Sequence, residues 1–552
     1  MNAAVICILG LVVFALGYRY YSRYLATKIF ALRDDEPVPA VELEDGIDYV
    51  PTDKHVLFGH HYASIAGAAP IIGPAVAVVW GWVPAVLWVV LGTVFMGAVH
   101  DFSTLVMSMR HKGQSVGTII GDVIGPRSRT LFLLVIFCLV MLVIAVFAKA
   151  IATLFMKQPG TVIPINFEIL VALFIGHWCY KKKKSLLWPS IVALVSLYMM
   201  VWVGIKVPVS LDSLFGSHTH TAWVVALLTY SFIASVLPVW VLLQPRDFIN
   251  GHQLIVGLAA LILGILIAHP TMNAPAFRMA PEGAPSWFPF LFVTIACGAI
   301  SGFHGLVSSG TTSKQLACAP DARPIGYGGM LGEGVLALIA TLAVSAGLAN
   351  WSSHYDNWNH AATSGVGNFV QGAATFLTAL EIPRGPAEVV IAVLVISFAA
   401  TSLDTGVRIQ RYILQELGKL YNVQLLQNRY IAGLIAVVFP LLLILGGKAG
   451  DLWVLFGSTN QLLAGLSLTV VTVWLIRLGK PWYHVGIPMV IVLVVAGIAM
   501  ATKLGQFVDK GDYMLACIGT VVLALEVWVV LEGIASIRRH RAKLPDARVA
   551  ER

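Results

Sequence analysis

The residues best suited to chemistry lie in one apolar stretch, residues 55–80, which polar side chains and helix breakers interrupt. The stretch is long enough to cross a bilayer. The polar residues in its middle are His60, His61, Tyr62 and Ser64. The helix breakers that follow them are Gly67, Pro70, Gly73 and Pro74. The pattern predicts a membrane-spanning helix that is broken near its centre.

A broken span exposes backbone amides and carbonyls, which are tolerated at bilayer depth only inside protein or along a cavity. A Gly/Pro-interrupted apolar segment is typical of the binding site of a secondary transporter. The alternative is a proline-kinked structural span whose glycines pack against a neighbouring helix. We predict the first of these, because a second interrupted span follows later in the chain.

The second interruption lies in the apolar residues 222–244, at the position that an inverted repeat requires. Its polar and proline residues are Thr229, Tyr230, Ser231, Ser235 and Pro238. Two broken helices that cross at the bilayer midplane offer helix N-termini to an anion and bare carbonyls to a cation. The two interruptions together predict a central site for a small anionic substrate.

A third feature is a run of hydroxyl side chains at the end of the apolar residues 286–308. These side chains are Ser301, Ser308, Ser309, Thr311, Thr312 and Ser313. Hydroxyl and carbonyl oxygens suit a hard cation such as Na⁺. The alternative is that the hydroxyls bond back to carbonyls of their own helix or cap its end.

Ionisable residues inside apolar spans are candidates for function because they are costly in hydrocarbon. They are His60, His61, His100, Asp101, Lys149, Glu168, His304, Glu333, Glu388, Asp404, Asp451 and Glu526. The histidines at 60, 61 and 304 border the interrupted segments, where each could bind a carboxylate, carry a coupling proton or simply be packed. The polar run from Gly457 to Gln461 is predicted to make hydrogen bonds between helices.

Three other ionisable residues, His100, Asp101 and Asp404, lie toward the predicted cytoplasmic ends of their spans. Asp101, with His100 beside it, is predicted to be neutralised by Arg110, and Asp404 by Arg408. These groups are predicted to form a gate or structural salt bridges rather than to touch the substrate.

Composition indicates an all-α, polytopic membrane protein. Of its 552 residues 58% are hydrophobic and only 12% are charged, whereas soluble proteins carry about 25% charged residues. The net charge of +8 lies in short loops, so nucleic acid is not an expected partner. The six cysteines have no metal or redox spacing, and we expect no disulfide, metal or cofactor beyond a bound Na⁺ or a coupling proton.

Hydropathy predicts fifteen spans. They cover residues 3–24, 57–80, 83–108, 130–155, 162–180, 185–206, 222–244, 252–269, 286–308, 326–349, 386–407, 428–447, 452–476, 484–502 and 514–537. The apolar residues 369–382 are too short to cross alone, and we predict a re-entrant or interfacial helix there. The alternative is a sixteenth short span, which would reverse the orientation of everything after it.

Basic residues fall about four to one into alternate loops of this arrangement. The basic set includes Lys181–Lys184, Arg246 and the Arg408–Arg429 segment. This bias predicts an external N-terminus and a cytoplasmic C-terminus. The predicted organisation is a first span and cytoplasmic loop (1–56), five helices (57–206), an inverted second five (222–412, with an external loop 350–385), accessory helices (428–537) and a basic cytoplasmic tail (538–552).

Five blocks of this sequence, at residues 58–75, 100–105, 301–316, 397–412 and 455–464, together resemble the carbon starvation protein A (CstA) family. The resemblance implies a bacterial inner-membrane uptake system for peptides or, in some members, pyruvate by proton symport. It also implies the five-plus-five inverted repeat of the amino acid–polyamine–cation superfamily.

Site residues carried over from the resemblance fall into two groups. The implied substrate site comprises Ser64, Ala66, Gly67, Ala68, Pro70, Tyr230, Ser231 and Ser235, to which our own reading adds His61 and His304. The implied cation site comprises backbone near Ala63 and Ala66 and the hydroxyls of Ser308, Ser309, Thr311 and Thr312. Either Na⁺ or a proton is compatible with this resemblance.

The leading function is therefore import of small carboxylate-bearing nutrients, peptides or pyruvate, by ion symport. The alternatives are a membrane sensor for the same ligand and a channel. An enzyme is not expected, because no metal-binding histidine spacing with a nearby carboxylate and no nucleotide-binding loop is present. The expected partners are a small-molecule substrate and the lipid bilayer.

Overall fold

A computed structural model describes residues 1–182, 187–446 and 452–549, and these residues are helical, with no β-strand among them. Lys183, Lys184 and Asp451 of the predictions above lie outside the described residues. The helices that build the bundle are α1 (Ala3–Leu16), α3 (Lys54–Ile65), α4 (Ala69–Ala77), α5 (Trp82–Gly92), α6 (Ala98–Arg110), α8 (Pro126–Lys157), α9 (Val162–Lys182), α10 (Leu187–Lys206), α12 (Thr219–Val236), α13 (Leu243–Ala268), α14 (Trp287–Ile295), α15 (Gly302–Gly310), α16 (Gly329–Ala346), α18 (Trp358–Thr378), α19 (Arg384–Leu420), α21 (Arg429–Leu445), α22 (Leu452–Arg477), α23 (Tyr483–Asp509) and α24 (Tyr513–Val549).

Thirteen candidate membrane spans occur in the described part of the chain, or fourteen when the bent pair α3–α4 counts as one span. The predicted class, an all-α polytopic membrane protein, is confirmed. The predicted span 428–447 corresponds to α21, which is shorter than the other spans. The total of fifteen spans therefore stays a prediction.

The predicted break in residues 57–80 is confirmed. α3 ends at Ile65, α4 begins at Ala69, and the two helices meet at an angle of 45°. Pro70 lies in the first turn of α4, where a proline costs no helical hydrogen bond. Gly67 is required by space, because a Cβ there would lie 2.7 Å from the Ser402 hydroxyl oxygen.

The predicted break in the middle of residues 222–244 is wrong. α12 ends at Val236 and α13 begins at Leu243, and the two are separate candidate spans with Pro238 in the connection between them. The other broken span is Trp287–Lys314, in which α14 ends at Ile295 and α15 begins at Gly302. Ala296 marks this break with a positive φ of 39°.

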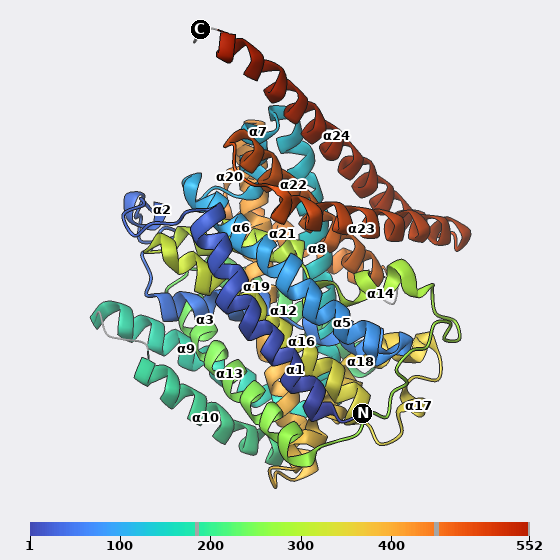
Figure 1. Cartoon of the computed structure of the whole chain (residues 1–552). Coiled ribbons are helices and arrows are strands. Elements are labelled where there is room, and N and C mark those ends of the chain that lie inside the picture. Colours follow the sequence, from blue (N-terminus) through green and yellow to red (C-terminus); the bar gives the residue numbers. More distant parts are fainter. Residues whose placement is uncertain (183–186, 447–451, 550–552) are drawn as a thin grey trace.

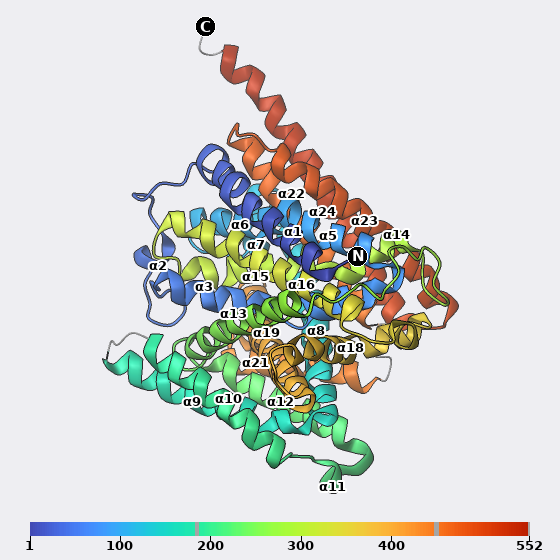
Figure 2. The ribbon, with the colours of Figure 1, turned by 60° about the horizontal axis from the view of Figure 1, so that its bottom comes forward.

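The two broken spans contact each other in the centre of the bundle. A Cβ on Gly73 of α4 would lie 2.6 Å from the Ile295 carbonyl oxygen of α14, so only glycine permits this approach. Around them pack the long helices α8, α16 and α19, whereas α9 and α10 lie at one edge of the molecule and α24 at another (Figures 1 and 2).

Residues 369–378 of the predicted segment 369–382 belong to α18, which begins eleven residues earlier than predicted, at Trp358, ends at Thr378, and is not among the candidate spans of the described chain. The helix packs closely on α4 and α16, as the contact of Gly365 with Val76 and of Gly372 with Ala343 shows. The alternative of a sixteenth span is therefore not supported, and α18 covers the second half of the first broken span.

Loops of the basic set meet at one end of the bundle. Arg110 pairs with Glu36 at 2.5 Å, and the Tyr412 hydroxyl donates to Asp48 at 2.6 Å. At the opposite end, the amide of Ala3 donates to the Pro270 carbonyl at 2.9 Å. These contacts agree with the predicted grouping of the loops that they join, but Arg246 is a buried residue of α13 rather than a loop residue. Which end faces the cytoplasm stays a prediction.

Candidate functional site

Two buried clusters of ionisable side chains lie beside the breaks. We call them the arginine cluster (His60, Tyr230, Ser231, Arg246, Asp247 and Asp404) and the histidine cluster (His100, Asp101, His304 and Glu333). The first joins α3, α12, α13 and α19, and the second joins α6, α15 and α16. Because buried charges are costly unless paired, the pairing within each cluster is central to the site.

In the arginine cluster one guanidinium contacts two carboxylates. Arg246 donates to Asp404, donates to the Tyr230 hydroxyl at 2.6 Å and lies 3.5 Å from Asp247. The Ser231 hydroxyl donates to Asp404 at 2.6 Å, and His60 Nδ1 lies 2.6 Å from Asp247. The guanidinium therefore compensates two carboxylates inside the protein.

In the histidine cluster one imidazole bridges two carboxylates. His304 Nδ1 lies 3.0 Å from Asp101, and His304 Nε2 lies 3.1 Å from Glu333 at an angle outside hydrogen-bond geometry. The other oxygen of Asp101 lies 2.8 Å from His100 Nδ1. All four side chains are fully buried. Such a chain of carboxylates and imidazoles is a typical proton site within a membrane.

The predicted neutralising partners of the two aspartates are wrong. Arg110 pairs with Glu36 instead of Asp101, and Arg408 donates to the carbonyls of Ala234 and Leu237 at the end of α12. Arg408 thus satisfies free carbonyl groups at the end of a helix, and Arg110 donates to the Phe30 carbonyl of the neighbouring loop. Asp101 and Asp404 lie deeper, where His304 and Arg246 reach them.

The structure brings several predicted substrate residues together through α19. The Ser402 hydroxyl donates to the Ser64 carbonyl at 2.9 Å, and Ser64 Oγ lies 3.4 Å from Thr405 Oγ1. Asp404, which accepts from Ser231, lies between Ser402 and Thr405 in the sequence of α19. Ala66, Gly67, Ala68 and Pro70 form the break itself. Ser235 is not part of this group, because its hydroxyl donates to the Phe232 carbonyl of its own helix.

The predicted cation residues are placed differently. The hydroxyls of Ser309 and Thr311 donate to the carbonyls of Gly305 and Val307 at 2.7 and 2.9 Å, the pattern of the alternative interpretation. Thr312 Oγ1 lies 2.9 Å from His61 Nδ1 and so links this helix end to α3. The Ser308 hydroxyl has no hydrogen-bond partner among the described residues. Ala63 and Ala66 are buried on the α3 side.

Asn460 of α22 supports the break between α14 and α15, which confirms the predicted interhelical role of residues 457–461. Its side-chain oxygen Oδ1 accepts a hydrogen bond from the Phe303 backbone amide at 3.0 Å. Its side-chain nitrogen donates to the Ser301 hydroxyl at 3.0 Å and to Cys297 Sγ at 3.2 Å. One side chain thereby satisfies polar groups on both sides of the unwound segment.

Replacing Asn460 with alanine is expected to lower the initial rate of substrate uptake at least about tenfold, because several buried polar groups lose their partner at about 1–3 kcal/mol each. The matched control is Thr459→Ala, since the Thr459 hydroxyl has no hydrogen-bond partner in the described structure. Uptake by membrane vesicles with equal amounts of each variant measures the difference. Equal rates in both variants would contradict the supporting role of Asn460.

Sequence reasoning missed Arg246, Asp247 and Asn250. Asn250 donates to Thr401 of α19 at 2.9 Å, close to the other two. The signal was present as an Arg-Asp pair next to a long apolar run, but the predicted span began at residue 252 and left the pair in a loop. The described residues hold no group of three or more His, Cys, Asp or Glu side chains placed for a metal ion.

Comparison with solved structures gives matches of low similarity. The structure of MhsT in complex with L-phenylalanine matches with 11% identity and a TM-score of 0.47, over 88% of this chain and 99% of that one. A mutant manganese transporter of Eremococcus coleocola matches with 13% identity and a TM-score of 0.43, over 90% and 99% of the chains.

Comparison with curated proteins gives much closer matches. A peptide transporter CstA of Mycobacterium tuberculosis is 35% identical, over 89% of this chain and 74% of that protein. The peptide transporter CstA of Bacillus subtilis is 32% identical over 85% of both, and the pyruvate/proton symporter BtsT of Escherichia coli is 33% identical over 88% and 79%. These relatives are transporters, so this chain is a multi-pass membrane transporter and not an enzyme. The family model described as carbon starvation protein CstA matches residues 2–351 and 345–499, and the chain belongs to this family.

Proposed function

We propose that this protein is a secondary active importer of small carboxylate-bearing nutrients, pyruvate or short peptides, at the bacterial inner membrane, and that it uses a proton as coupling ion. The observation that carries the proposal is that each of the two broken spans contributes a side chain to a buried ionisable cluster, α3 through His60 and α15 through His304. Relatives named as peptide transporters and as a pyruvate/proton symporter support the substrate class.

The substrate carboxylate is assigned to the break in α3–α4. The first turn of α4 begins at Ala69, and the N-terminus of a helix carries a partial positive charge and free amides that favour an anion. Ser231 approaches the same level by donating to Asp404 of α19. Tyr230 does so by accepting from Arg246, which also donates to Asp404. In this assignment the residues that contact the substrate from α3–α4 are Ser64, Ala66, Gly67, Ala68 and Pro70.

The inverted repeat is assigned to two units that each open on a broken span. The first unit comprises α3–α4, α5–α6, α8, α12 and α13, with α9 and α10 as an inserted pair. The second comprises α14–α15, α16, α19, α21 and α22. Support comes from the second break at residues 296–301 and from the packing of α9 and α10 with each other at the edge of the bundle (Figure 2).

The coupling proton is assigned to the histidine cluster. His304 lies between the carboxylates of Asp101 and Glu333, with His100 on the far side of Asp101. Tyr62 of α3 faces this cluster, since its hydroxyl approaches Gly332 next to Glu333. Protonation of this group changes the charge in the first turn of α15, directly after the second break.

The test is uptake by proteoliposomes of radiolabelled pyruvate and, in parallel, of radiolabelled N-acetylated dialanine, under imposed pH or Na⁺ gradients. Accumulation driven by a pH gradient, and not by Na⁺, is the expected result. Accumulation driven only by Na⁺ would overturn the proton assignment and favour the hydroxyls of Ser308, Ser309, Thr311 and Thr312. Absence of uptake for both solutes would favour a sensor, and uptake without accumulation would favour a channel.

The coupling residue is tested by His304→Gln, with the exposed His218→Gln as the control. The His304 variant is expected to lose accumulation driven by the pH gradient, by about tenfold or more, while it still exchanges internal for external pyruvate. Loss of both activities in a folded variant would contradict a role confined to the proton. Normal accumulation would remove His304 from the coupling path.

A further inference from the structure

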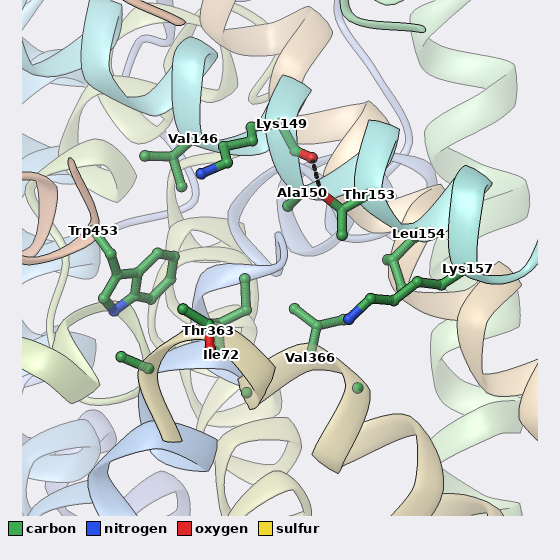
Figure 3. Close-up of a pocket in the computed structure, with 13 residues that line it drawn as sticks. Ile72, Val146, Lys149, Ala150, Thr153, Leu154, Lys157, Thr363, Val366 and Trp453 are labelled. Carbon is green, nitrogen blue, oxygen red and sulfur yellow. Dashed lines mark hydrogen bonds between the residues drawn. The ribbon is translucent and has the colours of Figure 1, made fainter. Parts of the chain in front are cut away.

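A cavity of about 290 Å³ lies outside the breaks and both clusters, between α8, α18, the start of α4 and Trp453. Figure 3 shows that Lys149 and Lys157 extend from α8 into the space above α18, where Thr363 and Val366 form the floor. Ile72 of α4 completes the wall next to the first break. The cavity therefore lies directly next to the proposed substrate site.

The wall contributed by α8 carries positive charge on one helix face. Lys149, Thr153 and Lys157 are spaced by four residues, which places their side chains one above another. The cavity has no acidic side chain in its wall, and neither lysine pairs with a carboxylate in the described part of the chain. Two ammonium groups with no carboxylate partner among the described residues, in a partly enclosed space, concentrate anions there.

The opposite wall is aromatic and apolar. The Trp453 ring lines the cavity with its carbon atoms, because its indole nitrogen is buried. The cavity thus combines two cations with apolar surface from Val146, Leu154 and Val366, a composition that suits a small organic anion.

A thin aromatic layer separates the cavity from the first break. Phe147 precedes Lys149 by two residues, and a Cβ on Gly67 would lie 3.0 Å from its ring. The Phe147 ring lies 6.3 Å from that of Phe456, which lies 5.5 Å from that of Trp453. Rotation of these rings would connect the cavity with residues 66–68.

We propose that this cavity is a loading site, in which Lys149 and Lys157 bind the carboxylate of an incoming small organic acid before it reaches the break. Eight residues of helix correspond to a rise of about 12 Å, which is longer than one small acid. The lysines therefore bind the carboxylate in succession, with Lys157 at the mouth and Lys149 next to the aromatic layer. The direction in which the acid moves rests on the proposed function, whereas the binding of the anion does not.

The binding itself is tested without transport. The purified full-length protein is acetylated briefly with and without millimolar pyruvate, and labelling of each lysine is measured by peptide mass spectrometry. Pyruvate is expected to slow the labelling of Lys149 and Lys157 severalfold and to leave Lys206 unchanged. Lys206 is a matched control, because the close contact of Gly204 with Gly160 places it at the same end of the bundle. Neutral ethyl pyruvate is expected to protect none of the three.

The role in loading is tested by uptake. K149Q/K157Q is expected to raise the KM for pyruvate about tenfold at low ionic strength, with a smaller difference in high salt because the charges are screened. The maximal rate stays within about twofold, and K206Q matches the unchanged protein. Equal protection of all three lysines, or an unchanged KM in the double variant, would overturn the proposal. Protection of Lys149 and Lys157 in a protein that transports no pyruvate would leave the anion site standing and overturn the proposed function.

Discussion

Replacing Gly67 with leucine is expected to abolish uptake, by about a hundredfold or more, in a protein that still folds and reaches the membrane. The added Cβ would lie 2.7 Å from the Ser402 hydroxyl and 3.0 Å from the Phe147 ring, before the rest of the leucine side chain is placed. Overpacking of this kind costs about 1–3 kcal/mol, which a large helical bundle tolerates. The leucine side chain at position 67 would push α19 and α8 away from the break, and it would also occupy the proposed substrate position.

The measurement is uptake normalised to monodisperse protein on a sizing column. Gly505→Leu in α23 is the matched control, since a Cβ at Gly505 has no atom within 4 Å. We expect that control to transport normally. Normal uptake by the Gly67 variant would remove the break in α3–α4 from the transport path.

Replacing Arg246 with glutamine is expected to be the most destabilising single change in the arginine cluster. The change leaves Asp247 and Asp404 buried without their shared cation, and breaking a buried ion pair in this way costs about 3–5 kcal/mol. Asp404→Asn is expected to cost less, because Arg246 retains Asp247 as a partner. The ordering of the two variants is therefore a test of the shared guanidinium.

Thermal denaturation in detergent, followed by loss of the monodisperse peak, measures this ordering. The double variant R246Q/D404N is the informative control, because it removes the cation and one carboxylate together and leaves Asp247 with His60. We expect the double variant to denature at a higher temperature than R246Q alone. A double variant less stable than R246Q would show that the hydrogen bonds, rather than the balance of charge, hold this region together.

The sequence was most informative where one local signal determines the structure. Gly67 and Pro70 terminate and restart a helix through their own backbone chemistry, so the first break could be predicted without knowledge of any neighbour. The second break could not be predicted in this way. Its residues from Ala296 to Ile300 are small and apolar, so hydropathy reads them as a continuous span, and a contact with Asn460 of a distant helix supports the unwound form.

The pairing of charges was also beyond local reasoning. Asp404 and Arg408 are four residues apart, the spacing at which opposite charges on a helix usually pair. In the structure Asp404 pairs with Arg246, which is 158 residues away in sequence. A partner of that kind depends on how α13 packs against α19, and the error in the start of α13 removed Arg246 from consideration.

The two consecutive histidines of α3 contact different parts of the bundle. His60 reaches Asp247 in α13, whereas His61 reaches Thr312 just beyond α15, which carries His304. Consecutive residues of a helix point about 100° apart, so the short helix α3 contacts α13 through one histidine and the end of α15 through the other. A tilt of α3 therefore strains the contacts with Asp247 and Thr312 together, so that the two sides of the bundle respond to the same motion.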